Sequence, residues 1–120
     1  MWKYEQRSGA LWRPTGGLLV QAYSGHKEGL NNPEMENVPD FGPIPKGLWE
    51  IGTAFTHQKA GPVTMRLQMQ SGALHGRSGF LIHGDNAKGD RSASNGCIVA
   101  PRWARLEISA SPDKSLLVVA

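Results

Sequence analysis

Short segments in which apolar and polar residues alternate run through much of the chain. The clearest covers residues 63–70, where four apolar residues alternate with four polar ones. This period of two is typical of a half-buried β-strand. Residues 47–52 alternate in a similar way, and so do residues 2–4. Continuous apolar runs predict more deeply buried strands at residues 18–23, 79–83 and 116–119.

Turn-forming sequences separate these segments, and the 15 glycines and 8 prolines are enough for a turn-rich fold. One helix is expected over residues 101–108, because Pro101 suits a first helical position and Trp103 and Leu106 would share a face. We therefore predict a mainly β fold, a sandwich with one short helix after Cys97, in a single domain over residues 1–120. Residues 24–46 form the longest stretch without strand character, which would be a lid or a covering segment.

Composition narrows the functional classes. The net charge of +3 arises entirely in residues 61–120, where the basic side chains are scattered. Such a surplus fits an anionic substrate at least as well as a nucleic acid. No apolar run approaches the ~18–20 residues of a membrane span, and residues 1–7 lack the apolar region of a signal peptide. The only cysteine, Cys97, excludes an intramolecular disulfide.

A histidine and the cysteine carry the candidate chemistry. His83 ends an apolar segment, and Gly96 and Cys97 open another one. A cysteine nucleophile needs a base, backbone N–H donors for the oxyanion and a group that orients the base. His83 can be the base, and the N–H groups around Gly96 and Cys97 can face a substrate carbonyl. The alternative is that Cys97 is strand packing and His83 a hydrogen-bonded strand-end histidine.

The segment from His83 to Cys97 resembles the signature of the L,D-transpeptidase catalytic domain. Ile82-His83-Gly84 and Ser94-x-Gly96-Cys97 carry this resemblance. Over about residues 2–119 the chain is more similar to the L,D-transpeptidase-like antibacterial effectors delivered by type VI secretion. That wider similarity lies in residues 23–25, 31–33, 42–47, 61–62 and 76–86.

The chain departs from ordinary L,D-transpeptidases at three points. Asn95 stands where they carry His, the spacer from His83 to Cys97 is short, and Val99 replaces the Arg or Asn often found there. These departures argue against cross-linking of cell walls. They leave the nucleophile and the base in place, and the effector branch tolerates other residues at the Asn95 position.

The resemblance implies a mechanism on peptidoglycan stem tetrapeptides, without a metal or organic cofactor. Cys97 would attack the carbonyl between the diamino acid and the terminal D-alanine, with His83 as base. The Gly84 carbonyl would orient His83, and N–H groups near Gly96 and Cys97 would hold the oxyanion. Water would then complete an L,D-carboxypeptidase reaction, whereas a free D-amino acid would complete an exchange. Arg77, Ser94 and Asn95 are the candidate substrate-binding residues, and Ser94 is also a candidate for a hydrogen bond within the loop before Cys97. For His57 and His75 a solvated or packing role is favoured over a place in the site.

Two other classes compete with this interpretation. Papain-like enzymes place Cys before His, which is the reverse of the order here. A non-catalytic wall-binding or interaction module would follow if Cys97 were buried and inert. The effector resemblance further implies synthesis in the cytoplasm, secretion into the periplasm of a target bacterium, a carrier of the secretion apparatus and a periplasmic immunity protein.

Overall fold

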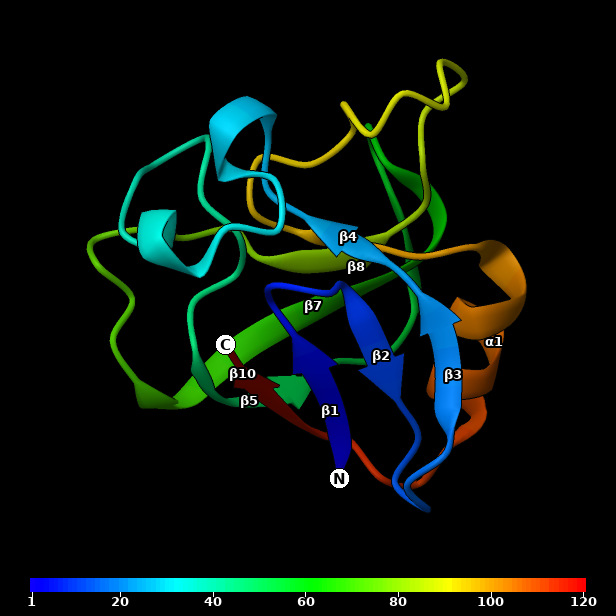
Figure 1. The fold of residues 1–120 in the computed structure, drawn as a ribbon. Coiled ribbons are helices and arrows are strands. Elements are labelled where there is room, and N and C mark those ends of the chain that lie inside the picture. Colours follow the sequence, from blue (N-terminus) through cyan, green and yellow to red (C-terminus); the bar gives the residue numbers. More distant parts are fainter.

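The computed structural model describes residues 1–120, which form one extended β-sheet path and a single α-helix (Figure 1). The strands are β1 (Trp2–Glu5), β2 (Ala10–Trp12), β3 (Leu18–Gln21), β4 (Tyr23–Ser24), β5 (Gly47–Ile51), β6 (Phe55–His57), β7 (Gly61–Gly72), β8 (Leu81–His83), β9 (Ile98–Val99) and β10 (Ser115–Val119). The helix α1 spans Arg102–Ala110, and two short 3₁₀ helices, η1 (Lys27–Gly29) and η2 (Pro33–Met35), lie in the long connection between β4 and β5.

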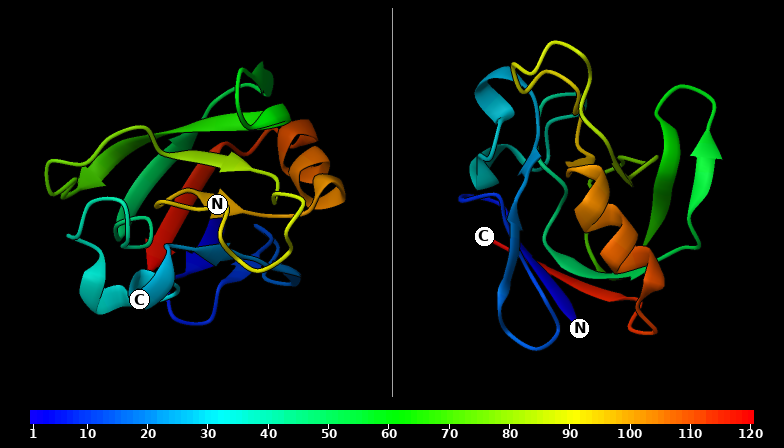
Figure 2. Two further views of the ribbon diagram at one scale, coloured as in Figure 1. Left: turned by 90° about the horizontal axis from the view of Figure 1, so that it is seen from above. Right: turned by 90° about the vertical axis from the view of Figure 1, so that its right-hand side faces the viewer.

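The sheet folds back on itself. Its strand order is β3-β2-β1-β10-β5-β7-β8-β9-β4, and β6 pairs with β7 beside this path. The two strands at the ends of this order, β3 and β4, are consecutive in sequence and are separated only by Ala22. The path must therefore curl until its ends meet, and the views from above and from the side show the resulting two layers (Figure 2).

The core lies between these layers. Trp49 is 1% exposed and meets the Phe80 ring edge-on, with 5.1 Å between ring centroids. Helix α1 contributes Ala104 and Ile108, one turn apart, to the same cluster. Burying each large apolar side chain contributes about 1.5–3 kcal/mol, so this cluster is the main source of stability.

The predicted mainly β fold with one short helix after Cys97 is confirmed. The alternating segment at residues 63–70 lies in β7, and the predicted helix is α1, with Pro101 one position before its first helical residue. Strands β2 and β6 were not predicted, because each has only three residues and too few positions for a period to show. No helix has both the length and the apolar character needed to cross a membrane.

Candidate active site

A cleft of about 530 Å³ contains both residues of the predicted catalytic pair. The β6–β7 hairpin contributes His57, Lys59 and Ala60 to its lining, and the loop that follows β8 contributes residues 84–86 and 93–95 in part. His83 and Cys97 line the same cleft. The lining residues are His57, Lys59, Ala60, Gly79, Leu81, His83, Gly84, Asp85, Asn86, Ala93, Asn95 and Cys97.

Two short parallel strands bring the pair together. In the β8–β9 ladder Ile82 is paired with Ile98, and His83 with Val99. The N–H of Ala100 also donates to the carbonyl of His83 at 3.0 Å. Ile82 and Ile98 are fully buried, so apolar burial fixes the register of this ladder. As a result Cys97, directly before β9, and His83, the last residue of β8, line the same cleft.

The His83 ring is oriented by the residue that follows it. Its Nδ1 lies 2.7 Å from the carbonyl oxygen of Gly84. A carbonyl only accepts, so Nδ1 carries the ring proton and Nε2 is free to take one. Burial lowers the pKa of His83 below its ordinary value. The Gly84 hydrogen bond raises this pKa, whereas the charges of Arg105 and His57 lower it, and the net shift is downward.

A buried arginine, Arg105, packs against Gly84, the residue whose carbonyl orients His83. Arg105 is 7% exposed and donates to the carbonyls of Ala100 (3.0 Å), Pro62 (2.9 Å) and Val63 (3.0 Å). Its Nη2 lies so close to Gly84 that a Cβ at that position would be 2.7 Å away. Gly84 is therefore the residue that allows the guanidinium to pack against the backbone beside His83.

The thiol of Cys97 rests in a hydrogen bond to the backbone. Its Sγ lies 3.7 Å from the carbonyl oxygen of Gly79, and no hydrogen bond joins it to His83. Burial raises the pKa of this thiol above its ordinary value, although the Leu81 N–H and the charge of Arg77 lower it. The two shifts thus favour the neutral form of each group, the thiol and the imidazole.

Ser94 organises the turn that leads to Cys97. This fully buried hydroxyl donates to the carbonyl of Cys97 (2.6 Å) and accepts from the N–H groups of Gly25 and Gly96, each at 3.0 Å. The Gly96 N–H, expected to serve the oxyanion, is thus already engaged. The Cys97 N–H makes no hydrogen bond within the chain. Gly96 has a φ of +131°, a conformation that favours glycine.

Arg77 supports the same turn from the other side. Four of its five N–H donors meet backbone carbonyls, those of Glu36 (2.6 Å), Pro43 (2.8 Å), Gly42 (2.9 Å) and Asn95 (3.2 Å). The guanidinium also lies over the Phe80 ring at 5.0 Å, and the residue is 7% exposed. The contacts of Arg77 and Ser94 are structural, and the substrate contacts expected for both remain predictions.

Asn95 and His57 face the cleft, whereas His75 does not. Asn95 is exposed and lines the cleft next to Cys97. His57 lines the cleft from the hairpin. His75 lies outside the cleft, 3.0 Å from a carboxylate oxygen of Glu36. Burial raises the pKa of Glu36, but hydrogen bonds from Gln6, the Lys46 N–H and His75 lower it, and the result is about 2.

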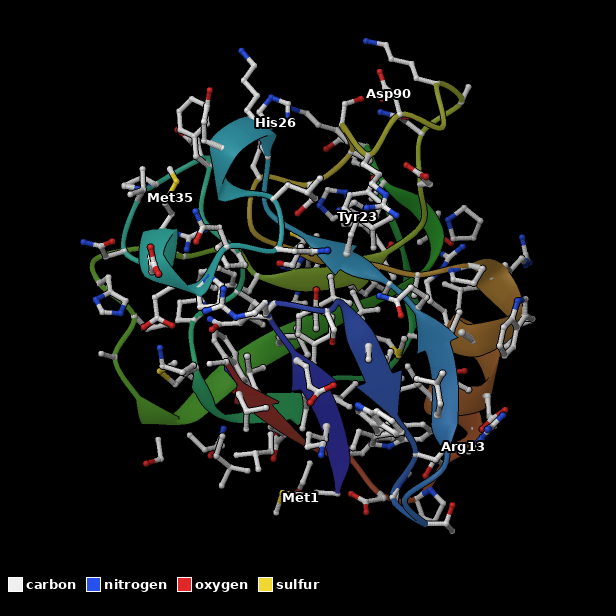
Figure 3. All side chains as sticks on the ribbon, in the orientation of Figure 1. Met1, Arg13, Tyr23, His26, Met35 and Asp90 are labelled. Carbon is white, nitrogen blue, oxygen red and sulfur yellow. The ribbon has the colours of Figure 1, made fainter.

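Strand β4 adds two residues that the sequence did not reveal. Tyr23 Oη donates to Asp85 (2.7 Å) and accepts from the Ala93 N–H (3.2 Å), so it ties both ends of the loop after His83. Figure 3 shows Tyr23 lying below this loop, which carries Asp90. Ser24 Oγ donates to the Gly96 carbonyl (3.2 Å) and accepts from the Ile44 N–H (2.9 Å). Residues 24–46 are thereby tied to the turn that carries Cys97.

Comparison with solved structures shows the fold. The avibactam carbamoyl enzyme of Ldtfm superimposes with a TM-score of 0.56 at 14% identity, over 99% of this chain and 48% of that one. A cysteine-to-serine mutant of the Enterococcus faecium L,D-transpeptidase gives a TM-score of 0.57 at 15% identity, over 98% and 48%. The chain thus spans about half the length of these proteins. The fold is that of L,D-transpeptidases, as the sequence predicted.

Comparison with family models gives the assignment. No curated protein sequence matches significantly. The model of the Tlde1 domain matches residues 19–112, a range that contains both His83 and Cys97. The Tlde1 domain is the L,D-transpeptidase-like domain of type VI effectors, so the family expected from the sequence is confirmed. The chain belongs to the Tlde1 domain family.

Proposed function

We propose that the chain is a cysteine enzyme that removes or exchanges the terminal D-alanine of peptidoglycan stem tetrapeptides. One observation carries the proposal: an imidazole whose Nδ1 is committed to Gly84 lines the same cleft as the only thiol. The free Nε2 of such an imidazole is a proton acceptor, and the thiol is the nucleophile that it can activate. Membership of the Tlde1 domain family supports peptidoglycan as the substrate.

The first half of the reaction forms a thioester. The Cys97 thiol gives its proton to His83 Nε2, and Sγ attacks the carbonyl carbon between the diamino acid and D-alanine. The Cys97 N–H donates to the resulting oxyanion, an interaction that can contribute about 3–4 kcal/mol. His83 then returns the proton to the nitrogen of D-alanine, the C–N bond breaks, and D-alanine leaves.

The second half of the reaction releases the acyl group. His83 takes a proton from a water molecule or from the amine of a D-amino acid, which attacks the thioester carbonyl. The C–S bond breaks and the thiol regains a proton from His83. Water gives a tripeptide, and a D-amino acid gives an exchanged tetrapeptide. In both products the bond between the diamino acid and the original D-alanine, which cross-linking uses, has been broken.

Before substrate binds, the Cys97 thiol is hydrogen-bonded to the backbone and not to His83. The thiol donates to the Gly79 carbonyl, so it must exchange this hydrogen bond for one to His83 when substrate enters. Catalytic hydrogen bonds are often long or absent before substrate binds. The mechanism starts from a neutral pair, because the pKa of His83 is lowered and that of Cys97 is raised. Activity should therefore have a broad plateau around neutral pH.

In the cell this chemistry would make the chain an antibacterial toxin. Consumption of donor stems in the periplasm of a target bacterium weakens a growing wall. The producing cell would need a periplasmic immunity protein that blocks the cleft, and a carrier of the secretion apparatus. Toxicity is tested by directing wild type and Cys97→Ala to the periplasm of a sensitive host. Equal growth in both cultures would contradict the toxin role.

The reaction itself is tested by mass spectrometry of purified tetrapeptide muropeptides. Wild type should release D-alanine, and Cys97→Ala and His83→Ala should each lower the rate by about 10³-fold or more. Added D-methionine separates exchange from hydrolysis through the mass of the product. Ser92→Ala, a variant in the exposed loop, is the matched control. Unchanged muropeptides with wild type would favour the non-catalytic binding module.

A further inference from the structure

His57 occupies a defined place at the cleft that the proposed mechanism does not use. It is the last residue of β6, and the turn after it, residues 58–60, leads back into β7 (Figure 2). His57, Lys59 and Ala60 are the hairpin residues that line the cleft. The hairpin therefore brings one imidazole and one ammonium group to the lining of the cleft.

The hydrogen bonds of the turn fix the tautomer of His57. Its Nδ1 lies 3.0 Å from the backbone nitrogen of Lys59 and 3.0 Å from that of Ala60. Both partners are N–H donors, so Nδ1 accepts and the ring proton resides on Nε2. The His57 ring also lies near the Phe55 ring, with 6.0 Å between their centroids. The Arg66 guanidinium lies over the Phe55 ring, 4.8 Å from its centroid. His57 is thus a positioned N–H donor.

The two sides of the cleft differ in charge and in free hydrogen-bonding capacity. On the loop side, one carboxylate oxygen of Asp85 already accepts from Tyr23 Oη (2.7 Å) and from the Asn86 N–H (2.9 Å). On the hairpin side, Lys59 is exposed and forms no salt bridge. Lys59 is the only lysine or arginine that lines the cleft, so an anionic group that enters finds its cationic partner on the hairpin.

The direction of proton transfer places the leaving group in the cleft that the hairpin lines. His83 must give its proton to the nitrogen of D-alanine, so this nitrogen has to come within hydrogen-bond distance of His83 Nε2. His57 and His83 both line the cleft in which this transfer takes place. In an α-amino acid the carboxylate is one carbon away from the nitrogen. The carboxylate of the leaving D-alanine must therefore also lie close to His83, within the cleft that His57 and Lys59 line.

We propose that His57 Nε2–H and Lys59 Nζ form a subsite for the α-carboxylate of the D-amino acid that leaves or enters the cleft. This inference rests on the proposed function and adds its specificity. The subsite would bind the terminal carboxylate of the tetrapeptide before cleavage and the carboxylate of the incoming D-amino acid during exchange. It selects chain ends over internal peptide bonds, which carry no such charge. Charge-assisted hydrogen bonds of this type are stronger than neutral ones.

The first test compares two substrates in four proteins. A tetrapeptide with a free terminal carboxylate and the same peptide with a terminal amide are offered to wild type, His57→Ala, His57→Gln and Lys59→Ala. Wild type should prefer the acid by about 10- to 100-fold in kcat/KM. His57→Ala and Lys59→Ala should reduce this preference to about 3-fold or less, and His57→Gln should restore part of it. Gln58→Ala, in the same turn, should leave the preference unchanged.

A binding measurement separates this inference from the proposed function. The imidazole resonances of Cys97→Ala are followed by NMR while D-alanine or D-alaninamide is added. D-alanine should shift the His57 resonance to saturation, and this shift should be lost in the Cys97→Ala, Lys59→Ala double variant. Equal shifts with both ligands, or equal wild-type rates on acid and amide peptides, would overturn the subsite. Absence of turnover on both peptides would overturn the proposed function, and the titration would still decide the subsite.

Discussion

The two flanks of the cleft are held in different ways, although each rests on one buried arginine. Arg77 and Arg105 are each 7% exposed, and neither forms a salt bridge. Arg77 connects carbonyls from residues 36–43 with the carbonyl of Asn95. Arg105 connects the start of α1 with the start of β7 and packs against Gly84. The Cys97 side of the cleft, the loop-side flank, is therefore held by contacts between loops. The His83 side, the helix-side flank, is held by contacts between the segment that enters α1 and strand β7.

The two charges also act on opposite partners of the proposed proton transfer. Arg77 lowers the pKa of Cys97, so it favours the thiolate. Arg105 lowers the pKa of His83, so it favours the neutral imidazole that accepts the proton. Arg77 thus stabilises the thiolate that the transfer produces, and Arg105 keeps His83 in the neutral form that can accept the proton. The comparison shows how positive charge on both flanks can serve a site whose pKa shifts favour the neutral form of both groups.

The largest effect is expected from removal of the loop-side arginine. Arg77→Met leaves four backbone carbonyls without their donor, and we expect it to lower the free energy of unfolding by about 3–5 kcal/mol. Arg77→Lys should recover only a small part, because an ammonium group cannot reach four carbonyls in a planar arrangement. Urea unfolding measures both. Arg105→Met leaves three carbonyls without their donor and should lower the free energy of unfolding by less than Arg77→Met does. Equal costs for the two methionine variants would refute the difference between the flanks.

The next largest effect is expected from Gly84→Ala, which disturbs the contact between Gly84 and Arg105 without removing the arginine. In Gly84→Ala the new Cβ would lie 2.7 Å from Arg105 Nη2, so either the guanidinium or the Gly84 carbonyl must move. We expect kcat/KM for D-alanine release to fall about 10- to 100-fold, because a small displacement of the base is costly. The control is Gly17→Ala, where nothing lies within 4 Å of the added Cβ. Wild-type activity in Gly84→Ala would show that the guanidinium moves away from the new Cβ and that the carbonyl of residue 84 stays in place.

A smaller effect concerns the acid stability of the loop-side flank. The pKa of Glu36 is about 2 in the fold, below its ordinary value near 4.5. Between these values the unfolded chain binds the proton more tightly, so the stabilisation is present above about pH 4.5 and is lost as the pH falls towards 2. Glu36→Gln should remove about 1–2 kcal/mol at pH 7 and little at pH 2. Unfolding curves at both pH values measure the difference. An equal loss at both would mean that Glu36 acts by packing alone.

The predictable part of the molecule lies in its strands and in its catalytic signature. The alternation at residues 63–70 predicted β7, because one face of that strand meets the core and the other meets solvent. His83 and Cys97 were found from their motif and their positions beside apolar segments. They do lie in one cleft, because the β8–β9 ladder that joins them is itself made of apolar residues.

The supporting residues could not be predicted, because their partners are backbone groups distant in sequence. The substrate contacts expected for Arg77 and Ser94 stay predictions, and a hydrogen bond of Ser94 within its loop was foreseen. The contacts of both residues with residues 25–43 were not. No pattern of side chains indicates such contacts. Arg105 left a faint signal, since it lies on the helix face that Ala104 and Ile108 bury. A charged residue on an apolar face needs buried partners, and this requirement could have marked it.

The smallest effect is a shift in the acid limb of the pH profile, and it tests the helix-side charge directly. The charge of Arg105 lowers the pKa of His83, so Arg105→Met should raise this pKa and move the acid limb to higher pH. Arg105→Lys keeps the charge and should leave the limb in place, even if it destabilises the fold. Arg102→Met removes an equal charge from an exposed position of the same helix and should move the limb less. The measurement is kcat/KM for D-alanine release between pH 4 and 8. A limb that stays fixed in Arg105→Met would show that the charge of Arg105 does not add to the effect of burial on this pKa, and the role of Arg105 would then be positional.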